Sequence, residues 1–431
     1  MKRAISTIVV LSILFGGSWV GVSYYAGVRA HTDIERLVNQ APEETALRFT
    51  NLVHDRGILG SSGQVILHYP DPSASGQPRE DLFRMRVTYA IDHRAMLATV
   101  FKFSWNAQLM DEAAQTMQRV FGQSPKLSGQ GNLTWQGQAS SSYRIPALQA
   151  QEHGDSLRLG EVTGGLRALD RALNFDLAMP GLEFSTAGEV LRLKDLRLTL
   201  DLTDRFAGIG SSTFGIDQLV FNAGQAHGLM VRGQNSIDQG RLNVRSDWQL
   251  ASLNAYGHKL SDVLIKFAVN DLDNRSVTAL SNVLNLSGNL ENLNEAQQIV
   301  VQSAVRDLIL KGFSVGVPTV FVRSGQATLE GDLVLTVKPT LTAPGSSPTR
   351  FNASKTLSSQ GNLILKGQGV PVSVTAAGLL LGILQQTGKG YESKYQFKDG
   401  LLSVNGQMLD VKAYLPVINE AVTELIKPIA N

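Results

Sequence analysis

Alternation of apolar and polar side chains is the main pattern along the chain, and it predicts β-strands. In residues 83–91 an apolar side chain stands at every second position, with arginine or threonine at positions between them. Gly, Asn or Asp bounds the later runs, as turns between antiparallel neighbours require. The same two-residue period predicts further strands at 65–69, 101–105, 133–135, 242–250, 263–269 and 333–337.

One run in the middle of the chain changes its phase. Between residues 191 and 202, the leucines before Lys194-Asp195 stand at odd positions and the leucines after it at even positions. Successive side chains of a strand point to opposite faces, so a shift of one residue would turn every leucine to the other face. We therefore expect a turn or a β-bulge at this dipeptide.

Several short motifs predict turns and hairpins. Lys398-Asp399-Gly400 and Asn405-Gly406 have the composition of tight hairpin turns, and Arg56-Gly57 marks the start of the first hairpin. The segments "SGQGNLTWQGQ", "SGQATLEGDLVL" and "SSQGNLILKGQG", which begin at residues 128, 324 and 358, resemble one another. They indicate a hairpin that recurs without a fixed period.

Helical patterns are the minority. Apolar residues at a 3.6-residue period predict helices at 107–121, at 294–311 and within the last segment, 410–429. The run "AAGLLLGIL" within 375–386 is too short to span a bilayer and favours a buried helix. In the helix at 294–311, Gly312 is the expected stop, and the residues expected to face inward are Ile299, Val300, Ala304, Leu308 and Ile309.

The N-terminus carries a targeting signal. Residues 4–28 hold no charge and follow Lys2 and Arg3, and as a helix they would exceed a hydrocarbon layer of about 30 Å. Aromatic side chains near the far end of this segment suit a membrane interface. A cleaved signal peptide would have a shorter apolar core, and the triplet at 28–30 is its candidate cleavage site. We expect an uncleaved anchor, with the rest of the chain outside the cytoplasm.

Together these patterns predict a mainly β protein with minor α content. We expect one or more long, curved antiparallel sheets with a few packing helices, preceded by one N-terminal transmembrane helix. The expected order is an anchor at 1–28, a β-rich region at 29–338, a flexible linker or loop at 339–358, and C-terminal strands with an amphipathic helix at 359–431 on the same body. Each sheet would have a hydrophobic concave face that helices, a second sheet, a partner or lipid must cover.

Composition excludes several classes of protein. The 431-residue chain has no cysteine, which rules out disulfide scaffolds, thiol nucleophiles and cysteine-ligated metal sites. Lys and Arg number 39 against 37 Asp and Glu, so the chain has no global field that would attract nucleic acid. Its 41 glycines and its low aromatic content are typical of many strands joined by tight turns.

From the sequence we assign no catalytic, cofactor-binding or metal-binding residue and no cofactor. The histidines form no pair at ligand spacing, and HExxH and GxGxxG are absent. His54-Asp55-Arg56 combines a base, an acid and a cation, but adjacent residues do not face one another. Asp92-His93 stands at a strand end, where turn chemistry explains it equally well. Residues 382–390 are one residue too long for a phosphate loop.

Motifs near both ends of the chain carry a resemblance to a known family. They are "YYAGVRAHTDIERLVNQ" and "VHDRGILGSSGQVILHYP" near the start and "YESKYQFKDGLLSVNGQMLD" near the end, and a late-middle segment, "AVRDLILKGFSVGVPTVFVRSGQATLEGDLVLTVKP", adds to them. In these segments the chain resembles the YdgA/YihF family of inner-membrane-anchored periplasmic bacterial proteins, which share a domain of unknown function. The resemblance covers the whole chain. It implies a location and an architecture, and it offers no catalytic residues.

The expected function is therefore non-enzymatic. We expect a binding or envelope-assembly protein of the bacterial inner membrane, held by residues 4–28, with the bulk of its chain in the periplasm. A sharper hypothesis is an apolar groove for acyl chains, which rests on the leucine-rich strand faces. The alternatives are a self-associating structural protein and a periplasmic hydrolase built from scattered Asp, Glu and His. The expected partners are the membrane, lipid or an envelope protein, and a second copy in a homo-oligomer; nucleic acid is not expected.

Overall fold

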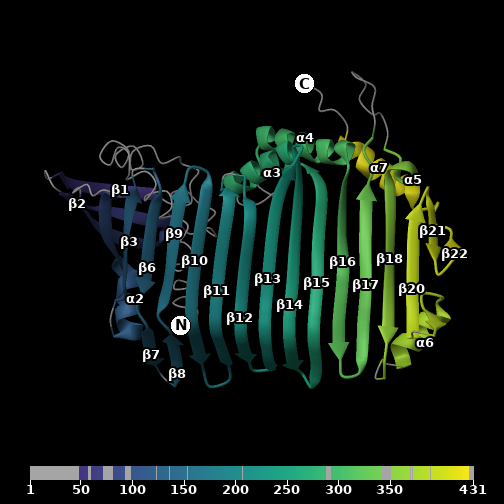
Figure 1. Ribbon diagram of the computed structural model, residues 1–431, viewed down its shortest axis with the longest axis horizontal. Helices are drawn as coiled ribbons and strands as arrows, with labels where there is room; N and C mark the ends of the chain where they lie inside the picture. Colours follow the sequence, from purple (N-terminus) through teal and green to yellow (C-terminus); the bar gives the residue numbers. More distant parts are fainter. Residues whose placement is uncertain are drawn as a thin grey trace. The chain divides into compact units, whose positions relative to one another are not determined.

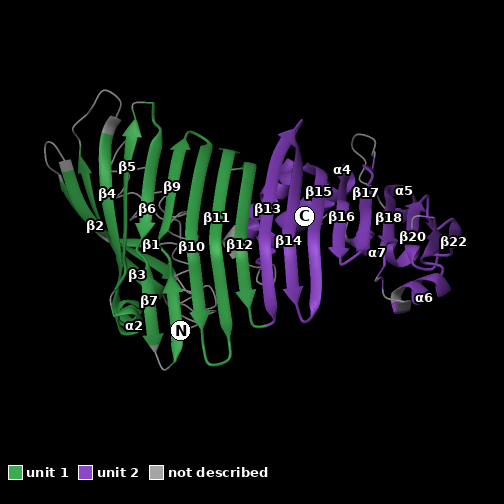
Figure 2. Ribbon diagram, turned by 60° about the horizontal axis from the view of Figure 1, so that its bottom comes forward, with its two compact units in different colours: residues 1–222 green, residues 223–431 purple. Residues whose placement is uncertain are grey.

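The chain forms two compact units, residues 1–222 and residues 223–431, and antiparallel strands make up most of the described residues of both (Figure 2). The computed structural model describes residues 48–56, 60–70, 81–92, 99–122, 124–134, 136–152, 154–205, 207–287, 293–340, 351–368, 370, 372–388 and 390–426. The predicted anchor at residues 4–28 lies outside these ranges. The mainly β composition is confirmed, and the boundary between the units falls inside the β-rich region predicted at 29–338.

The first unit is an antiparallel meander in which neighbouring strands along the chain pair with one another (Figure 1). The hairpin of β7 and β8 interrupts the meander, because β6 pairs with β9 and β10 pairs with both β8 and β9. The strands are β1 Arg48–Arg56, β2 Gly60–Pro70, β3 Asp81–Asp92, β4 Thr99–Leu109, β5 Lys126–Thr134, β6 Ala139–Ile145, β7 Leu148–Glu152, β8 Asp155–Leu159, β9 Val162–Leu169, β10 Ala172–Ser185, β11 Val190–Asp204 and β12 Ile209–Phe221.

The change of phase in the leucine run lies inside β11. Asp195 has a positive φ of 51°, and Leu193 and Leu196 on either side of it both pack against the core. Their partners in β10, Leu182 and Met179, are both buried, so β10 changes phase at the same level. Since both strands skip a residue together, their pairing stays in register. The predicted reset is confirmed, as an irregular residue within a strand and not as a turn.

The core of the first unit lies on one face of its sheet. Alternate residues of β2–β10 form this core. The helix α2, Asp111–Phe121, covers part of the core by packing against β3, β4 and β7. Trp105 and Met85 are the largest of its fully buried side chains. The helix predicted at 107–121 begins only at Asp111, because Ala107–Leu109 pair with β3 and extend β4. At these positions, hydrogen bonding to β3 stabilises a strand although the sequence has a helical period.

Two of the three similar glycine-containing segments are strands with one shared packing device. Gly131 in β5 lies opposite Phe103, and a side chain at this glycine would collide with the ring of Phe103. Gly361 lies opposite Tyr395 in the same way. In both cases the aromatic ring occupies the space that glycine leaves above the backbone. The third segment differs, because Gly325 takes a positive φ in the turn between two strands.

The second unit is also an antiparallel sheet, in which β13 to β18 follow one another and β20 to β22 continue from β18. The strands are β13 Gly224–Asp238, β14 Arg241–Ala255, β15 His258–Asp273, β16 Phe313–Ser324, β17 Ala327–Val337, β18 Leu357–Lys366, β19 Gln385–Thr387, β20 Gly390–Lys398, β21 Leu401–Val404 and β22 Gln407–Leu409. The helices are α3 Asn274–Ser287, α4 Glu295–Lys311, α5 Ala353–Thr356, α6 Val372–Leu380 and α7 Leu415–Ile426.

Local signals located the ends of several elements correctly. Asn294 caps α4 in a capping box with Gln297, and the helix ends before Gly312, as predicted. Asp399-Gly400 and Asn405-Gly406 both have positive φ values and join β20 to β21 and β21 to β22, which confirms both hairpin turns. The turn predicted at Arg56-Gly57 includes residues outside the described ranges, although β1 and β2 do pair.

Other predictions about burial were wrong. In α4 only Ala304 is buried, whereas Ile299 and Val300 are 43% and 40% exposed, because this helix packs mainly on α3 and α7 at the ends of the strands. The segment predicted as a buried helix at 375–386 forms α6, an extended turn and β19, and most of its leucines are exposed.

The predicted linker at 339–358 also needs correction. Its described C-terminal part forms α5 and the beginning of β18, and Phe351 and Ala353 there are buried against α4 and α7. Aromatic and aliphatic side chains within the Ser- and Thr-rich segment give it a packed end. None of the helices within the described ranges is long and apolar enough to cross a membrane.

Candidate functional site

One face of the second unit is apolar across neighbouring strands. Residues that stand directly opposite each other in an antiparallel pair point to the same face. Trp248 stands opposite both Val231 and Ile265, and Ile265 stands opposite Val320. We call this surface the apolar face and define it by Val231, Trp248, Leu250, Val263, Ile265, Phe267, Val269, Val315, Val317, Val320, Leu333, Leu335, Leu363 and Leu365.

The apolar face carries no ionisable group in the middle of its sheet. On this side of β14 to β18, within residues 242–250, 263–269, 313–322, 329–337 and 357–365, the register places no Asp, Glu, Lys, Arg or His. The charges lie on the opposite side, where Lys366 Nζ pairs with Glu330 Oε2 at 2.6 Å. The sheet thus has one apolar side and one charged side. This pattern is typical of a sheet whose apolar side is covered.

The described helices do not cover the apolar face. Trp248 is 48% exposed, Phe267 40% and Leu333 43%. The helices α3, α4 and α7 lie along one end of the strands (Figure 1). The rings of Trp248 and Phe267 contact each other edge to face, with centroids 5.9 Å apart. Such a surface can bind a ligand through van der Waals contacts and the burial of apolar area. It cannot donate hydrogen bonds from charged groups.

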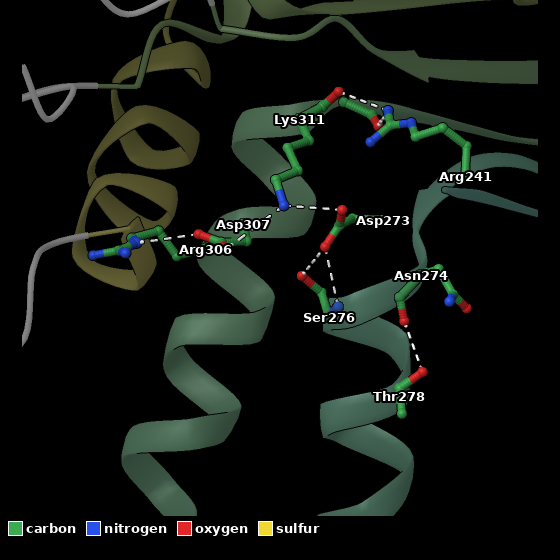
Figure 3. A network of polar contacts seen from close by, with 9 residues as sticks. Arg241, Asp273, Asn274, Ser276, Thr278, Arg306, Asp307 and Lys311 are labelled. Atoms are coloured by element: carbon green, nitrogen blue, oxygen red, sulfur yellow. Dashed lines mark hydrogen bonds and ion pairs between the residues drawn. The ribbon is translucent and has the colours of Figure 1, made fainter. Parts of the chain in front are cut away.

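A polar cluster fastens α3 and α4 to the ends of the strands (Figure 3). The Oδ2 atom of Asp273 accepts hydrogen bonds from the backbone N–H and the hydroxyl of Ser276, at 3.0 and 2.7 Å. Its Oδ1 atom lies 2.9 Å from Lys311 Nζ at the end of α4. Arg241 donates to the carbonyls of Lys311 and Gly312, at 2.8 and 2.6 Å. Asp273 thus caps the start of α3, and Arg241 caps the end of α4.

The pKa of Asp273 agrees with a structural role. Burial alone would raise the pKa of this carboxyl, but the hydrogen bonds from Lys311 and Ser276 outweigh burial and hold the pKa below its ordinary value. The carboxylate is therefore ionised and engaged on both oxygens at neutral pH. A proton-transfer catalyst would need a pKa near the working pH, so we assign this cluster to the support of the helices.

The polar face of the first unit contains a hollow of about 1060 Å³. It can form hydrogen bonds with a polar molecule, but no histidine stands in its lining. Asp92, which the sequence singled out, lies here at the end of β3. The hydroxyl and amide side chains of the lining are Ser104, Gln130, Asn132, Ser140, Ser142 and Asn174, and its charged side chains are Asp92, Lys102, Arg167 and Asp176.

The His54-Asp55-Arg56 motif does not form a catalytic group. His54 Nδ1 lies 2.7 Å from the hydroxyl of Tyr89, a residue of another strand, whereas Asp55 is exposed. Burial raises the pKa of Tyr89 to about 12, so the phenol keeps its proton at neutral pH. Residues 382–390 also do not form a phosphate loop. Such a loop precedes a helix, whereas this segment follows α6 and contains β19.

Sequence analysis missed one ordered row of polar groups. Thr50 Oγ1 lies 2.6 Å from His68 Nε2, and His68 Nδ1 lies 2.7 Å from Asp81 Oδ2. Hydroxyl, imidazole and carboxylate in this order are the groups of nucleophilic catalysis. However, Thr50 is exposed on a strand, and none of the three lines the hollow that contains Asp92. We therefore assign the row to contacts between β1, β2 and β3.

Within the described part of the chain, no group of three or more His, Asp and Glu side chains could hold a metal ion. Residues 1–370 match the model of one protein family, described as "Bacterial protein of unknown function (DUF945)". Comparisons with curated proteins and with solved structures found no match.

Proposed function

Because the chain belongs to the DUF945 family of bacterial proteins of unknown function, we propose its role from its surfaces. The proposed role is non-enzymatic binding of lipid, with acyl chains held against the apolar face of the second unit. The observation that carries this proposal is the apolar face itself, which is half-exposed and free of charge in the middle of β14 to β18. Large exposed apolar surfaces of this kind are uncommon on soluble proteins without a partner.

Acyl chains fit this surface better than polar ligands do. A polar ligand would lose its hydrogen bonds to water and gain none from valine, leucine, isoleucine and phenylalanine side chains. A hydrocarbon chain gains about 0.8 kcal/mol for each methylene that it buries. The face crosses neighbouring strands about 4.8 Å apart, so an extended chain can contact several strands in turn.

We further propose that the protein works at the bacterial inner membrane, as a member of the YdgA/YihF group within its family. The uncharged segment at 4–28 would anchor it there, and the two units would face the periplasm. Fractionation with N-terminal sequencing tests the anchor. A mature chain that begins near His31 in the soluble periplasmic fraction would contradict it.

Lipid binding is tested with protein that lacks residues 1–28, purified without detergent and analysed by mass spectrometry of extracted lipids. We expect acyl lipid to co-purify at a constant ratio to protein. Light scattering on the same sample measures the oligomeric state. Protein that is repeatedly empty would refute lipid binding, and empty protein that is dimeric would indicate that a second copy covers the face.

A further inference from the structure

A short turn after α6 presents leucine side chains to solvent. Leu380 is 87% exposed, Leu381 72%, Ile383 49% and Leu379 40%. We call these four residues the α6 tip. The tip belongs to a different part of the second unit from the apolar face, and it is the sequence "AAGLLLGIL" that had been predicted to be buried.

The tip is held outward by contacts on its other side. Gly382 takes a positive φ of 67° and ends the helix, and the N–H of Leu384 donates to the carbonyl of Gly378 at 2.9 Å. The side chain of Leu384 is buried over Gly378. Asn405, in the turn between β21 and β22, donates from its side chain to the carbonyls of Gly382 and Ile383, at 3.0 and 2.9 Å. The backbone is therefore satisfied while the leucines stay exposed.

The chain segment that forms the tip carries no charge. Residues 367–388 contain no Asp, Glu, Lys, Arg or His, and Lys366 and Lys389 bound this segment. Met408 of β22 adds an apolar side chain that is 58% exposed, next to Gln407, which approaches Gly382. Protein interfaces usually add Tyr, Trp or Arg at their centres, and the tip has none of them. An aliphatic projection without a charged side chain of its own instead matches the hydrocarbon boundary of a bilayer.

From this geometry we propose that the α6 tip inserts into the surface of a phospholipid bilayer. The inference does not depend on acyl-chain binding, because it rests on other residues. Loss of lipid from the apolar face would leave tip insertion intact, and loss of tip insertion would leave lipid on the apolar face. The two proposals therefore fail separately.

The absence of cysteine allows a direct test with the full chain. A spin label on Leu381→Cys is the only labelled thiol, and the protein is reconstituted into phosphatidylcholine vesicles at several protein-to-lipid ratios. The matched control is Val417→Cys, which is 67% exposed on α7 at the opposite end of the strands (Figure 1). Collisions of each label with oxygen, which dissolves in hydrocarbon, and with a water-soluble nickel chelate are measured.

We expect the label at 381 to collide more often with oxygen and less often with nickel than the label at 417. Adding Leu380→Asp to the Leu381→Cys chain should return its label to the behaviour of the control. Equal collision ratios for both labels would overturn the proposal. Protection of the label at 381 from nickel that increases with the protein-to-lipid ratio would also overturn the proposal, because a second copy of the protein would then cover the tip.

Discussion

Replacing two leucines of β17 should weaken lipid binding without disturbing the fold. Leu333 and Leu335 lie on the apolar face opposite Val317 and Val315 of the neighbouring strand. The double variant Leu333→Thr/Leu335→Thr introduces β-branched side chains, which suit a strand, and it replaces each isobutyl group by a smaller, polar 1-hydroxyethyl group. The backbone pairing of the strand is unchanged by this substitution.

The expected loss follows from the exposure of the two side chains. Leu333 is 43% and Leu335 41% exposed, so a bound chain would remove about two fifths of each from water. Full burial of a leucine contributes about 1.5–3 kcal/mol, and the two sites together therefore contribute about 1–2.5 kcal/mol to binding. Since about 1.4 kcal/mol corresponds to a factor of ten, Kd should rise roughly 5- to 60-fold.

Titration of protein lacking residues 1–28 with cis-parinaric acid measures this change, because the fluorescence of this fatty acid increases in apolar surroundings. The matched control is Val334→Thr, on the same strand and partly buried on the opposite side. It should keep the wild-type Kd. If the double variant bound the fatty acid as tightly as the control, or if both lost binding equally, the argument from the apolar face would be refuted.

Three further predictions concern stability. Asp273→Ala should lower the free energy of unfolding by about 2–3 kcal/mol in urea denaturation, since a lost cap costs about 1 and a charge-assisted hydrogen bond about 1.5. Asp273→Asn keeps the cap, so its free energy of unfolding should fall by less than that of Asp273→Ala. The difference in free energy of unfolding between wild type and Asp273→Asn should shrink as the pH falls through the lowered pKa of Asp273, because the wild-type carboxylate is then protonated. Because Tyr89 keeps its proton up to about pH 12 when folded, stability should fall between about pH 10 and that value, and less so in Tyr89→Phe. Gly361→Val should cost about 1–3 kcal/mol by displacing the tyrosine ring above it, whereas Gly188→Val, which has open space, should have little effect; equal losses would contradict the packing account.

Signals that depend on neighbouring residues were sufficient to predict many elements. The alternation in 83–91, the stop of α4 at Gly312 and the turn at Asp399-Gly400 each involve a few consecutive residues. Each specifies backbone geometry before any tertiary contact forms. The phase change at Asp195 was also predictable, because a strand with both leucine sets on one face must contain an irregular residue.

Predictions that depended on tertiary context were less successful. Ala107 has a helical spacing with the residues after it, yet pairing with β3 holds it in a strand. Ile299 and Val300 were expected to face inward, but helices at the end of a sheet have little surface to pack against. The leucines of the α6 tip have the composition of a buried helix. Their exposure follows from tertiary and turn contacts, namely those of Leu384 with Gly378 and of Asn405 with the turn.

The sequence predicted that the candidate site would be an apolar sheet face, but it did not predict which strands would form that face. Leucine-rich strands predicted apolar sheet faces. The sequence does not reveal that the first unit buries its face, in part under α2, and that Trp248 and Phe267 of the second unit are half-exposed. The row of Thr50, His68 and Asp81 was missed for a similar reason. Its members are 18 and 13 residues apart, and only strand pairing brings them together.

Photo-crosslinking in cells at two adjacent residues of β15 tests the central claim most directly. A benzophenone amino acid replaces either Phe267, on the apolar face, or Lys266, on the opposite side of the same strand. After irradiation, mass spectrometry identifies lipid attached to the protein. We predict acyl lipid on the protein labelled at 267 and none at 266. Equal labelling at both positions, or none at 267, would contradict the proposal that this face binds acyl chains.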